Sequence, residues 1–333
     1  MKTTHHKAIK NLTLPALAAA LACGIAGNAL AQSDAWPARP VTMIVPLSPG
    51  AAVDIETRMY AQKLSESMGR PFLVDYKPGA GTTIGAAFVV KSAPDGYTLL
   101  SMTPSLAVAP LAYPNLSFDP FKDLTLLSLM SKRPSMFVVP MSLPVKNMTE
   151  YVAYARANPG KLNVGTSGAG GLGELALGWL HQMANLKVQL IHYKGGAPSY
   201  TAVMAGEVHA VFGSVAAMMG NIKAGKAKAL AVTTSERSSI LPDLPTVAEQ
   251  GFPGFEYAQW IGVAGPAGLP PAVVARLSVE LPKAAKAPDI LQKLSGDGTL
   301  MVGNSPEQFR TYFNQEAARW RKVVQDTGIK LAE

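Results

Sequence analysis

The residues best suited to holding a ligand stand in one glycine-rich stretch near the middle of the chain. It begins as a short apolar segment at 162–166, continues through the glycines of 168–173 and enters a helical pattern from Glu174. Glycine lets backbone N–H groups come close to a ligand, because no Cβ intervenes. A helix that follows such a loop adds unpaired N–H donors and a partial positive charge. The stretch is therefore a candidate site for an anion such as a phosphate or a carboxylate.

Three known motifs partly match this stretch. The G-x-G-x-x-G pattern of 168–173 fits the dinucleotide fingerprint, but residues 188–194 lack the carboxylate that would hold the ribose. The nucleophile elbow around Ser167 lacks its final glycine, because Ala169 stands there. A P-loop would need Gly-Lys-Ser or Gly-Lys-Thr after the glycines, and that sequence is absent. A glycine turn that only joins a strand to a helix is the remaining alternative.

Strand and helix signals alternate along most of the chain. Strands are expected at 41–45, 72–75, 97–101, 136–139, 162–166, 188–193, 210–212, 229–233 and 260–264. Helices are expected at 54–68, 82–92, 148–157, 174–184, 198–205, 216–223, 270–282, 286–295 and 306–327. This alternation predicts an α/β fold with mixed, mostly parallel sheets. In such sheets the ligand lies beyond the carboxyl ends of the strands.

The loops that follow these strands supply the candidate binding residues. Loops 46–53 and 102–106 should share one rim, where Thr103 and Ser105 are candidate hydrogen-bonding groups. On a second rim we expect the glycine loop together with Tyr193, Lys194, Gly213 and Ser214. Lys194 either pairs with a carboxylate or is a solvated surface lysine. Asp54 stands near a helix start, a position that favours capping or orienting the helix over ligand contact.

Residues 1–31 have the features of a secretory signal peptide, with a basic start, an apolar segment at 12–25 and the cleavage signal Ala29-Leu30-Ala31. This signal peptide predicts export to the periplasm, with cleavage after Ala31. Lipoprotein processing at Cys23, the single cysteine, is the alternative. The leader holds three lysines and no acids, so its loss lowers the net charge from +8 to +5. That mild excess, without a dense basic block, argues against nucleic-acid binding.

The length after the leader suits two domains, and no apolar run there is long enough to cross a membrane. We expect one lobe from 36–136 plus 256–333 and a second lobe from 137–255, because the chain crosses twice between two α/β units. Two such units with facing loop rims describe a hinged ligand trap.

Several segments, taken in order, resemble the Bug-type periplasmic solute receptors of tripartite tricarboxylate transporters. The matching segments are 40–46, 77–81, 84–86, 93–99, 193–195, 222–226, 241–249 and 266–271. The resemblance implies a two-lobed Venus-flytrap fold of the type II-like periplasmic binding proteins. It also implies binding of a small organic carboxylate without catalysis, and docking of the loaded receptor on membrane permease subunits. The ligand contacts that it implies are Ser48, Pro49, Gly50, Ala51, Ala52 and Val53, with Thr166, Ser167, Gly168, Ala169, Gly170 and Gly171.

The chain departs from the family pattern near the expected pocket. Hydroxyl or acidic residues common in the family are replaced by Val53, Gly171, Leu172, His209 and Gly213. A pocket without an acidic partner does not favour an amino acid, whose ammonium needs a counter-charge. The expected ligand is a di- or tricarboxylate or an aromatic carboxylate. Of these, the departures favour the less hydrophilic acids, which include the aromatic ones.

Two other functions are compatible with the sequence. A secreted serine hydrolase would use Ser167, although no histidine or aspartate is recognisably placed to complete a triad. A sensor that presents its ligand to a membrane kinase would share the fold and the site. We expect that the protein uses no cofactor and that it is a monomer. We also expect no metal, because His181, His192 and His209 lack metal-ligand spacing.

Overall fold

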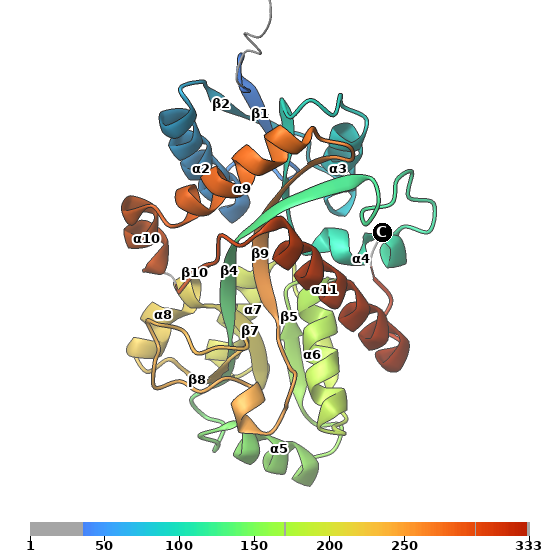
Figure 1. The fold of residues 1–333 in the computed structure, drawn as a ribbon. Coiled ribbons are helices and arrows are strands. Elements are labelled where there is room, and N and C mark those ends of the chain that lie inside the picture. Colours follow the sequence, from blue (N-terminus) through green and yellow to red (C-terminus); the bar gives the residue numbers. More distant parts are fainter. Residues whose placement is uncertain (1–35, 170, 297, 332–333) are drawn as a thin grey trace, which may run out of the picture. The chain divides into compact units, whose positions relative to one another are not determined.

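The computed structural model describes residues 36–169, 171–296 and 298–331. The fold lies in one structural unit, Arg39–Glu333. Its strands form one mixed sheet in the order β2-β1-β3-β9-β4-β7-β5-β6, and β8 and β10 also pair with β4 (Figure 1). The strands are β1 Val41–Val45, β2 Phe72–Tyr76, β3 Thr98–Met102, β4 Leu124–Pro140, β5 Asn163–Thr166, β6 Gln189–His192, β7 Ala210–Ser214, β8 Ala227–Val232, β9 Ala258–Pro266 and β10 Leu300–Met301.

The parallel pairs lie toward the two ends of this strand order, and the antiparallel pairs lie at its centre. Strand β1 is parallel to β2 and β3, and β5 is parallel to β6 and β7. Strand β4 is antiparallel to β9 over Leu124–Pro134. From Ser135 onward it is antiparallel to β7, and from Met136 to β8. Because β4 changes partners beside the predicted boundary at 136/137, it joins two groups of strands. The division into two lobes stays a prediction.

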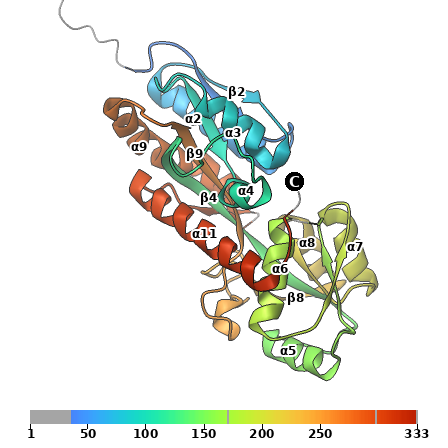
Figure 2. The ribbon, with the colours of Figure 1, turned by 90° about the vertical axis from the view of Figure 1, so that its right-hand side faces the viewer.

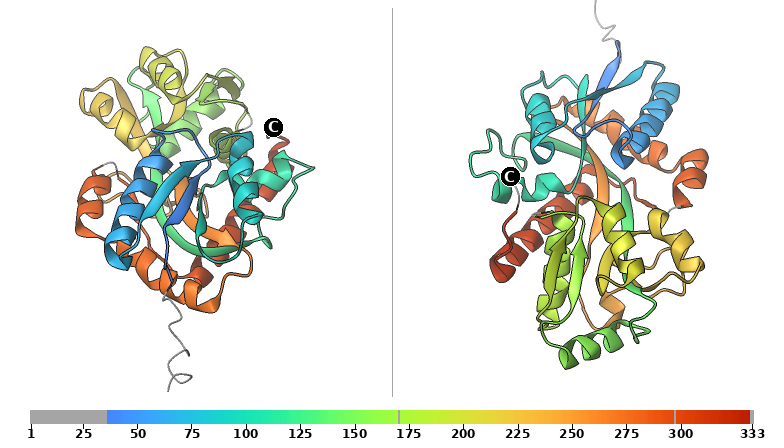
Figure 3. Two further views of the ribbon diagram at one scale, coloured as in Figure 1. Left: turned by 90° about the horizontal axis from the view of Figure 1, so that it is seen from above. Right: turned by 180° about the vertical axis from the view of Figure 1, so that it is seen from behind.

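Helices follow most of the strands, as the alternating pattern predicts. They are α2 Ala52–Met68, α3 Thr83–Val90, α4 Ser105–Ala112, α5 Met148–Ala157, α6 Leu172–Met183, α7 Gly196–Ala205, α8 Val215–Lys223, α9 Pro271–Ala285, α10 Pro288–Ser295 and α11 Pro306–Thr327, with single 3₁₀ turns at Ala80–Thr82 and Ala248–Gln250. Seen from behind, α2 and α9 lie next to each other (Figure 3), and they are in contact. Among the described residues, no helix is both long and apolar enough to cross a bilayer.

Two of the elements that differ from the sequence-based expectation contain a proline. The strand expected at 136–139 begins twelve residues earlier, at Leu124, and carries Pro134 at the point where β4 changes partners. Proline cannot donate to a ladder, so it argues against a continuous strand. Helix α4 was not expected, because Pro110 stands inside it. Burial of Leu106, Val108 and Ala109 stabilises α4 despite the missing N–H.

Helix α11 contributes to two separate hydrophobic cores. Its first turns place Phe309 and Phe313 against Trp260 in the core around β1, β3 and β9. Its later turns place Trp320 and Val323 in the core around β5, β7 and α6. The helix is seen side-on in Figure 2, and it contacts both β4 and α6. One continuous helix therefore ties the two cores together.

The second core contains a buried polar pair, Tyr151 and His181. The Tyr151 hydroxyl lies 2.8 Å from His181 Nε2, and His181 Nδ1 lies 2.7 Å from the carbonyl oxygen of Leu177. A carbonyl can only accept, so the imidazole proton sits on Nδ1 and Nε2 accepts from the tyrosine. Both side chains are buried. Burial lowers the pKa of the His181 imidazole to about 4, from 6.5.

We expect the free energy of unfolding to fall between pH 6.5 and pH 4 because of His181. In that window the imidazole is protonated in the unfolded chain but stays neutral in the folded chain. The contribution of His181 to the free energy of unfolding is therefore present above pH 6.5 and is lost as the pH falls. The loss should be about 2 kcal/mol by pH 5. Urea unfolding at pH 7.5 and pH 5 measures it. His181→Gln should flatten the pH dependence, and a variant that kept the slope of the unmodified chain would contradict the assignment.

Candidate functional site

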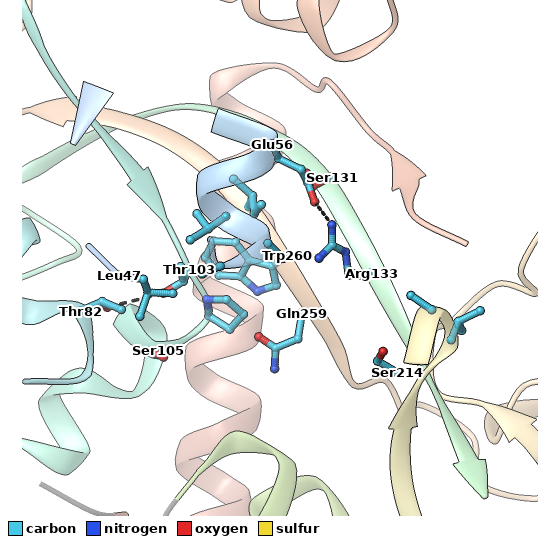
Figure 4. Close-up of a pocket in the computed structure, with 17 residues that line it drawn as sticks. Leu47, Glu56, Thr82, Thr103, Ser105, Ser131, Arg133, Ser214, Gln259 and Trp260 are labelled. Atoms are coloured by element: carbon cyan, nitrogen blue, oxygen red, sulfur yellow. Dashed lines mark hydrogen bonds and ion pairs between the residues drawn. The ribbon is translucent and has the colours of Figure 1, made fainter. Parts of the chain in front are cut away.

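A cavity of about 400 Å³ lies where three strands end and three helices begin. Helices α2, α4 and α8 start shortly after β1, β3 and β7, and their first residues line this central cavity. Figure 4 shows Thr103 and Ser105 on one side of it and Ser214 on the other, with Gln259 between them in this view. The cavity is lined by Leu47, Ala51, Ala52, Val53, Glu56, Thr82, Thr103, Pro104, Ser105, Ser131, Arg133, Ser214, Val215, Ala216, Gln259, Trp260 and Ile261.

Helix α2 presents two backbone donors to the central cavity. Its N-cap, Ala51, has an extended backbone and accepts from the N–H groups of Asp54 and Ile55. The N–H groups of Ala52 and Val53 come before the first intrahelical donor and have no acceptor within the described part of the chain. Both residues line the cavity. The start of α2 can therefore donate to an anion.

Asp54 holds the loop that leads into α2. Its carboxylate accepts from the N–H of Gly50 at 2.8 Å, from Arg58 at 2.8 Å and from the Tyr76 hydroxyl at 2.7 Å. Burial opposes ionisation, but these three hydrogen bonds outweigh it, so the pKa of Asp54 lies below its ordinary value. Asp54 does not line the cavity. The expectation that it orients the helix start is confirmed.

Helices α4 and α8 present similar starts. Ser105 opens α4 directly after Pro104, which has no N–H. The Leu106 N–H donates to the Thr103 carbonyl at 3.2 Å, and the Ser105 N–H has no acceptor within the described residues. In α8 the Ser214 hydroxyl caps the helix by accepting from Ala217 N–H at 3.2 Å. The N–H groups of Val215 and Ala216 have no acceptor within the described residues.

Three helix N-termini on one cavity create a region of positive potential. Each helix start is equivalent to roughly half a positive charge, with N–H groups directed outward. A carboxylate placed there receives hydrogen bonds from backbone N–H groups and does not require an ion pair with lysine or arginine. Chemically, the arrangement is suited to binding an anion.

A buried ion pair forms one wall of the cavity. The Glu56 carboxylate, 1% exposed, accepts from Tyr60 at 2.8 Å and from Ser131 at 2.5 Å, and it forms an ion pair with Arg133 (Figure 4). Arg133 also donates from Nε to the Thr299 hydroxyl at 3.3 Å. Because the two charges oppose each other, this wall is close to neutral. Arg133 is therefore held in place by Glu56 and Thr299, and the negative charge of Glu56 offsets the positive charge of Arg133.

Some of the predicted site residues meet at the central cavity. Those that line it are Ala51, Ala52, Val53, Thr103, Ser105 and Ser214. Ser48, Pro49 and Gly50 are exposed in the loop just before α2 and do not line it. Gly50 has a φ of +87°, which a glycine adopts without strain, and its N–H is the one that Asp54 holds.

The described residues of the predicted glycine loop, 166–169 and 171, lie outside the central cavity. Thr166 is buried, and its hydroxyl lies 3.0 Å from the carbonyl oxygen of Gly168 and 3.0 Å from His192 Nδ1. Ser167, Ala169 and Gly171 are exposed. Gly170 lies outside the described residues. The loop precedes α6, whose first residues do not line the cavity, so contact between this loop and the ligand stays a prediction.

The remaining predicted residues have other surroundings. Tyr193 is half-buried and packs in the core around β7 and α8, and Lys194 is exposed. Gly213 is buried, and a Cβ added there would lie 2.7 Å from Met218 Cγ, so its place in the fold requires close packing. None of these three lines the central cavity.

The geometry around Ser167 does not resemble a catalytic triad among the described residues. His192 lies 3.0 Å from Thr166 and 3.5 Å from Glu174, and no described contact joins it to the Ser167 hydroxyl. Within the described residues, no group of three histidine, cysteine, aspartate or glutamate side chains is placed to hold a metal ion.

Several residues of the cavity were not predicted from the sequence. They are Glu56, Thr82, Ser131, Arg133, Val215, Ala216, Gln259 and Ile261, whereas Leu47 and Pro104 lie in the two loops that were expected on one rim. Ser131 and Arg133 were missed because the first half of β4 was not predicted. Trp260 is 2% exposed and packs on Phe309 and Phe313, yet it also lines the cavity.

Comparison with known families identifies the chain. Residues 57–329 match the model of the tripartite tricarboxylate transporter family receptor, TctC. The chain belongs to this family. The resemblance inferred from the sequence segments is confirmed. Members of the family are periplasmic solute receptors, and the predicted α/β fold of periplasmic binding proteins is also confirmed for this receptor.

Two curated relatives cover nearly all of the receptor. A UPF0065 protein of Pseudomonas sp. strain P51, in the tcbD-tcbE intergenic region, is 37% identical over 92% of this chain and 91% of its own length. Protein BugT of Bordetella pertussis is 32% identical over 90% of this chain and 93% of its own.

Three solved structures share the fold. R. palustris Rpa4515, solved with adipate, is 34% identical with a TM-score of 0.73 and covers 89% of this chain and 99% of its own. Periplasmic binding protein BugD is 30% identical with a TM-score of 0.70, and the match covers 89% of this chain and 100% of BugD. MatC of Rhodopseudomonas palustris, solved with bound malate, is 28% identical with a TM-score of 0.69. The match covers 87% of this chain and 100% of MatC.

Proposed function

We propose that this receptor binds a small organic carboxylate in the central cavity and delivers it to the permease subunits of a tripartite transporter. The observation that carries the proposal is the convergence of three helix N-termini on one cavity. The adipate and malate in the structures of two relatives support a carboxylate ligand. Export to the periplasm by cleavage after Ala31 and action as a monomer belong to the same proposal. The leader lies outside the described residues.

Ligand binding would act by drawing two parts of the cavity together. Helices α2 and α4 start beside β1 and β3, whereas α8 starts beside β7, on the other side of the partner change in β4. A carboxylate that contacts both sides would favour a closed arrangement, because only a differential contact shifts such an equilibrium. The predicted lobes, 36–136 plus 256–333 and 137–255, would be the moving parts.

Proline substitution at the first helical residue tests the site with little change to the fold. Proline is tolerated there because its missing N–H has no intrahelical acceptor. Ala51 and Ser214 already have the extended backbone that a following proline requires. Ala52→Pro and Val215→Pro should each weaken adipate binding roughly tenfold to a hundredfold, since a hydrogen bond to a charged group contributes about 1.5–3 kcal/mol.

Leu172→Pro is the matched control, because it removes the corresponding N–H at the start of α6 beside the glycine loop. Calorimetry with adipate measures all three variants, and thermal melting checks their folding. If Leu172→Pro alone weakened binding, the ligand would lie at the glycine loop and the central cavity would be excluded as the site.

A further inference from the structure

We propose that the ligand of this receptor is a carboxylate with a hydrocarbon body, without hydroxyl or amino substituents. The inference rests on the proposed function and concerns the part of the ligand beyond its carboxylate. It follows from which groups in the cavity wall already have partners and which surfaces are left for the ligand.

The acidic side chain in the cavity wall is already fully engaged. Glu56 accepts from Tyr60 and Ser131 and pairs with Arg133. A ligand ammonium would have to compete with these three donors for a carboxylate that is 1% exposed. An amino acid would therefore place its cation among helix N-termini with no available counter-charge, which is unfavourable.

Three hydroxyl groups of the cavity, those of Thr103, Ser131 and Ser214, also have contacts within the protein. The buried Thr103 hydroxyl lies 3.5 Å from that of Thr82, at the limit of a hydrogen bond. The Ser131 hydroxyl donates to Glu56, and the Ser214 hydroxyl caps α8. Ser105 makes no hydrogen bond with its hydroxyl in the described part of the chain, and it lies at the start of α4, where a carboxylate would bind.

Besides the Arg133 guanidinium, which pairs with Glu56, the wall contains the amide of Gln259. Its side chain is exposed, and its Nε2 donates to the Tyr257 hydroxyl at 3.0 Å. Because solvent reaches it, Gln259 can exchange partners with water and gives little preference for a polar ligand. Away from the helix starts, a hydroxyl on the ligand body would thus have to compete with these existing contacts, or with water, for a partner.

The rest of the wall is apolar and comes from both sides of the cavity. The side chains beyond the backbone donors are Leu47, Val53, Pro104, Val215, Trp260 and Ile261. Val53, Val215 and Trp260 are buried and held by the surrounding cores. Such walls favour methylene or aromatic groups, and each buried methylene contributes about fourfold in affinity. Specific polar contacts at one end and an apolar remainder are typical of small-molecule sites.

Matched pairs of acids test this inference on the unmodified mature receptor by calorimetry. Succinate and malate differ by one hydroxyl, and glutarate and glutamate differ by one ammonium. Benzoate adds an aromatic body. We expect the unsubstituted member of each pair to bind roughly tenfold to a hundredfold more tightly, because an unpaired buried polar group costs about 1–3 kcal/mol.

The outcomes separate this inference from the proposed function. If malate or glutamate bound as tightly as its unsubstituted partner, the inference would be overturned while carboxylate binding stood. If neither adipate nor any of these five acids bound, the proposed function itself would fail.

A pair of threonine variants gives an independent arm. Val215→Thr adds a hydroxyl to the cavity wall at nearly constant volume and should narrow the preference for succinate over malate at least threefold. Val279→Thr, on the exposed surface of α9, is the control and should leave it unchanged. A preference that did not move in Val215→Thr would contradict the assignment of this wall.

Discussion

Replacing Ala52 by aspartate should reduce adipate binding at least a hundredfold while leaving the melting temperature of the receptor as high as that of the unmodified chain. Ala52 is the first residue of α2 and lies at the central cavity, and its backbone N–H has no acceptor among the residues that the structure describes. An acidic side chain at a helix start interacts favourably with the helix dipole, so the fold should tolerate the change.

Binding should fail because the new carboxylate would occupy the region that we assign to the ligand. Two carboxylates about 4 Å apart repel each other by about 4 kcal/mol at an effective dielectric constant of about 20. That energy corresponds to nearly a thousandfold in affinity. The tethered group would also take the N–H donors of α2 that the ligand needs.

Ala52→Asn is the control, because it has nearly the same shape without the charge. Calorimetry with adipate should show a loss of less than about tenfold for asparagine against the large loss for aspartate. Should the aspartate variant bind adipate within tenfold of the unmodified receptor, the anion would not lie at the start of α2. Loss of folding in the aspartate variant would be detected as a lowered melting temperature.

Replacing Trp320 by alanine should lower the free energy of unfolding by about 3–5 kcal/mol. Trp320 is 1% exposed and packs edge-on against Trp179 and Tyr257 at ring-centroid distances of 6.0 and 6.4 Å. Its indole N–H donates to Glu316 at 3.1 Å. Truncation would leave a cavity between α6 and α11 and an acceptor without its donor.

Urea unfolding at neutral pH measures this effect, and thermal melting should fall by roughly 10 °C. Arg321→Ala, one residue further on the exposed side of α11, should change stability by less than about 0.5 kcal/mol. Similar losses in both variants would show that α11 is stabilised by its own helix propensity and not by the buried tryptophan.

Trp320 also bears on ligand binding, because α11 joins both cores. Adipate affinity in Trp320→Ala should change less than tenfold, since Trp320 does not line the central cavity. A larger loss would show that the position of α11 controls how the two sides of the cavity meet.

The elements with strong local signals were predicted to within a residue. Helix α5 begins after Asn147, whose side chain accepts from Glu150 N–H, and it ends before the Pro159-Gly160 stop. Helix α11 begins after Ser305, which forms a capping box with Gln308. Caps and breakers act over one helical turn, so they can be recognised without the rest of the chain.

The first half of β4 and helix α4 could not be predicted in the same way. Pro134 and Pro110 oppose a strand and a helix locally. What stabilises these elements is long-range, namely the pairing of β4 with β9 and the burial of α4 against α11. Tertiary packing thus overrode the local preference.

The sequence by itself determined the α/β class, most of the helices and the family, because these depend on periodicity, caps and ordered segments. It also indicated that helix starts would hold an anion. Only the tertiary structure decided which starts face one cavity, since that depends on strand order. It selected α2, α4 and α8, and it paired Arg133 with Glu56 across 77 residues of sequence. Every helix has a positive N-terminus, so no local pattern could have distinguished these three from α6.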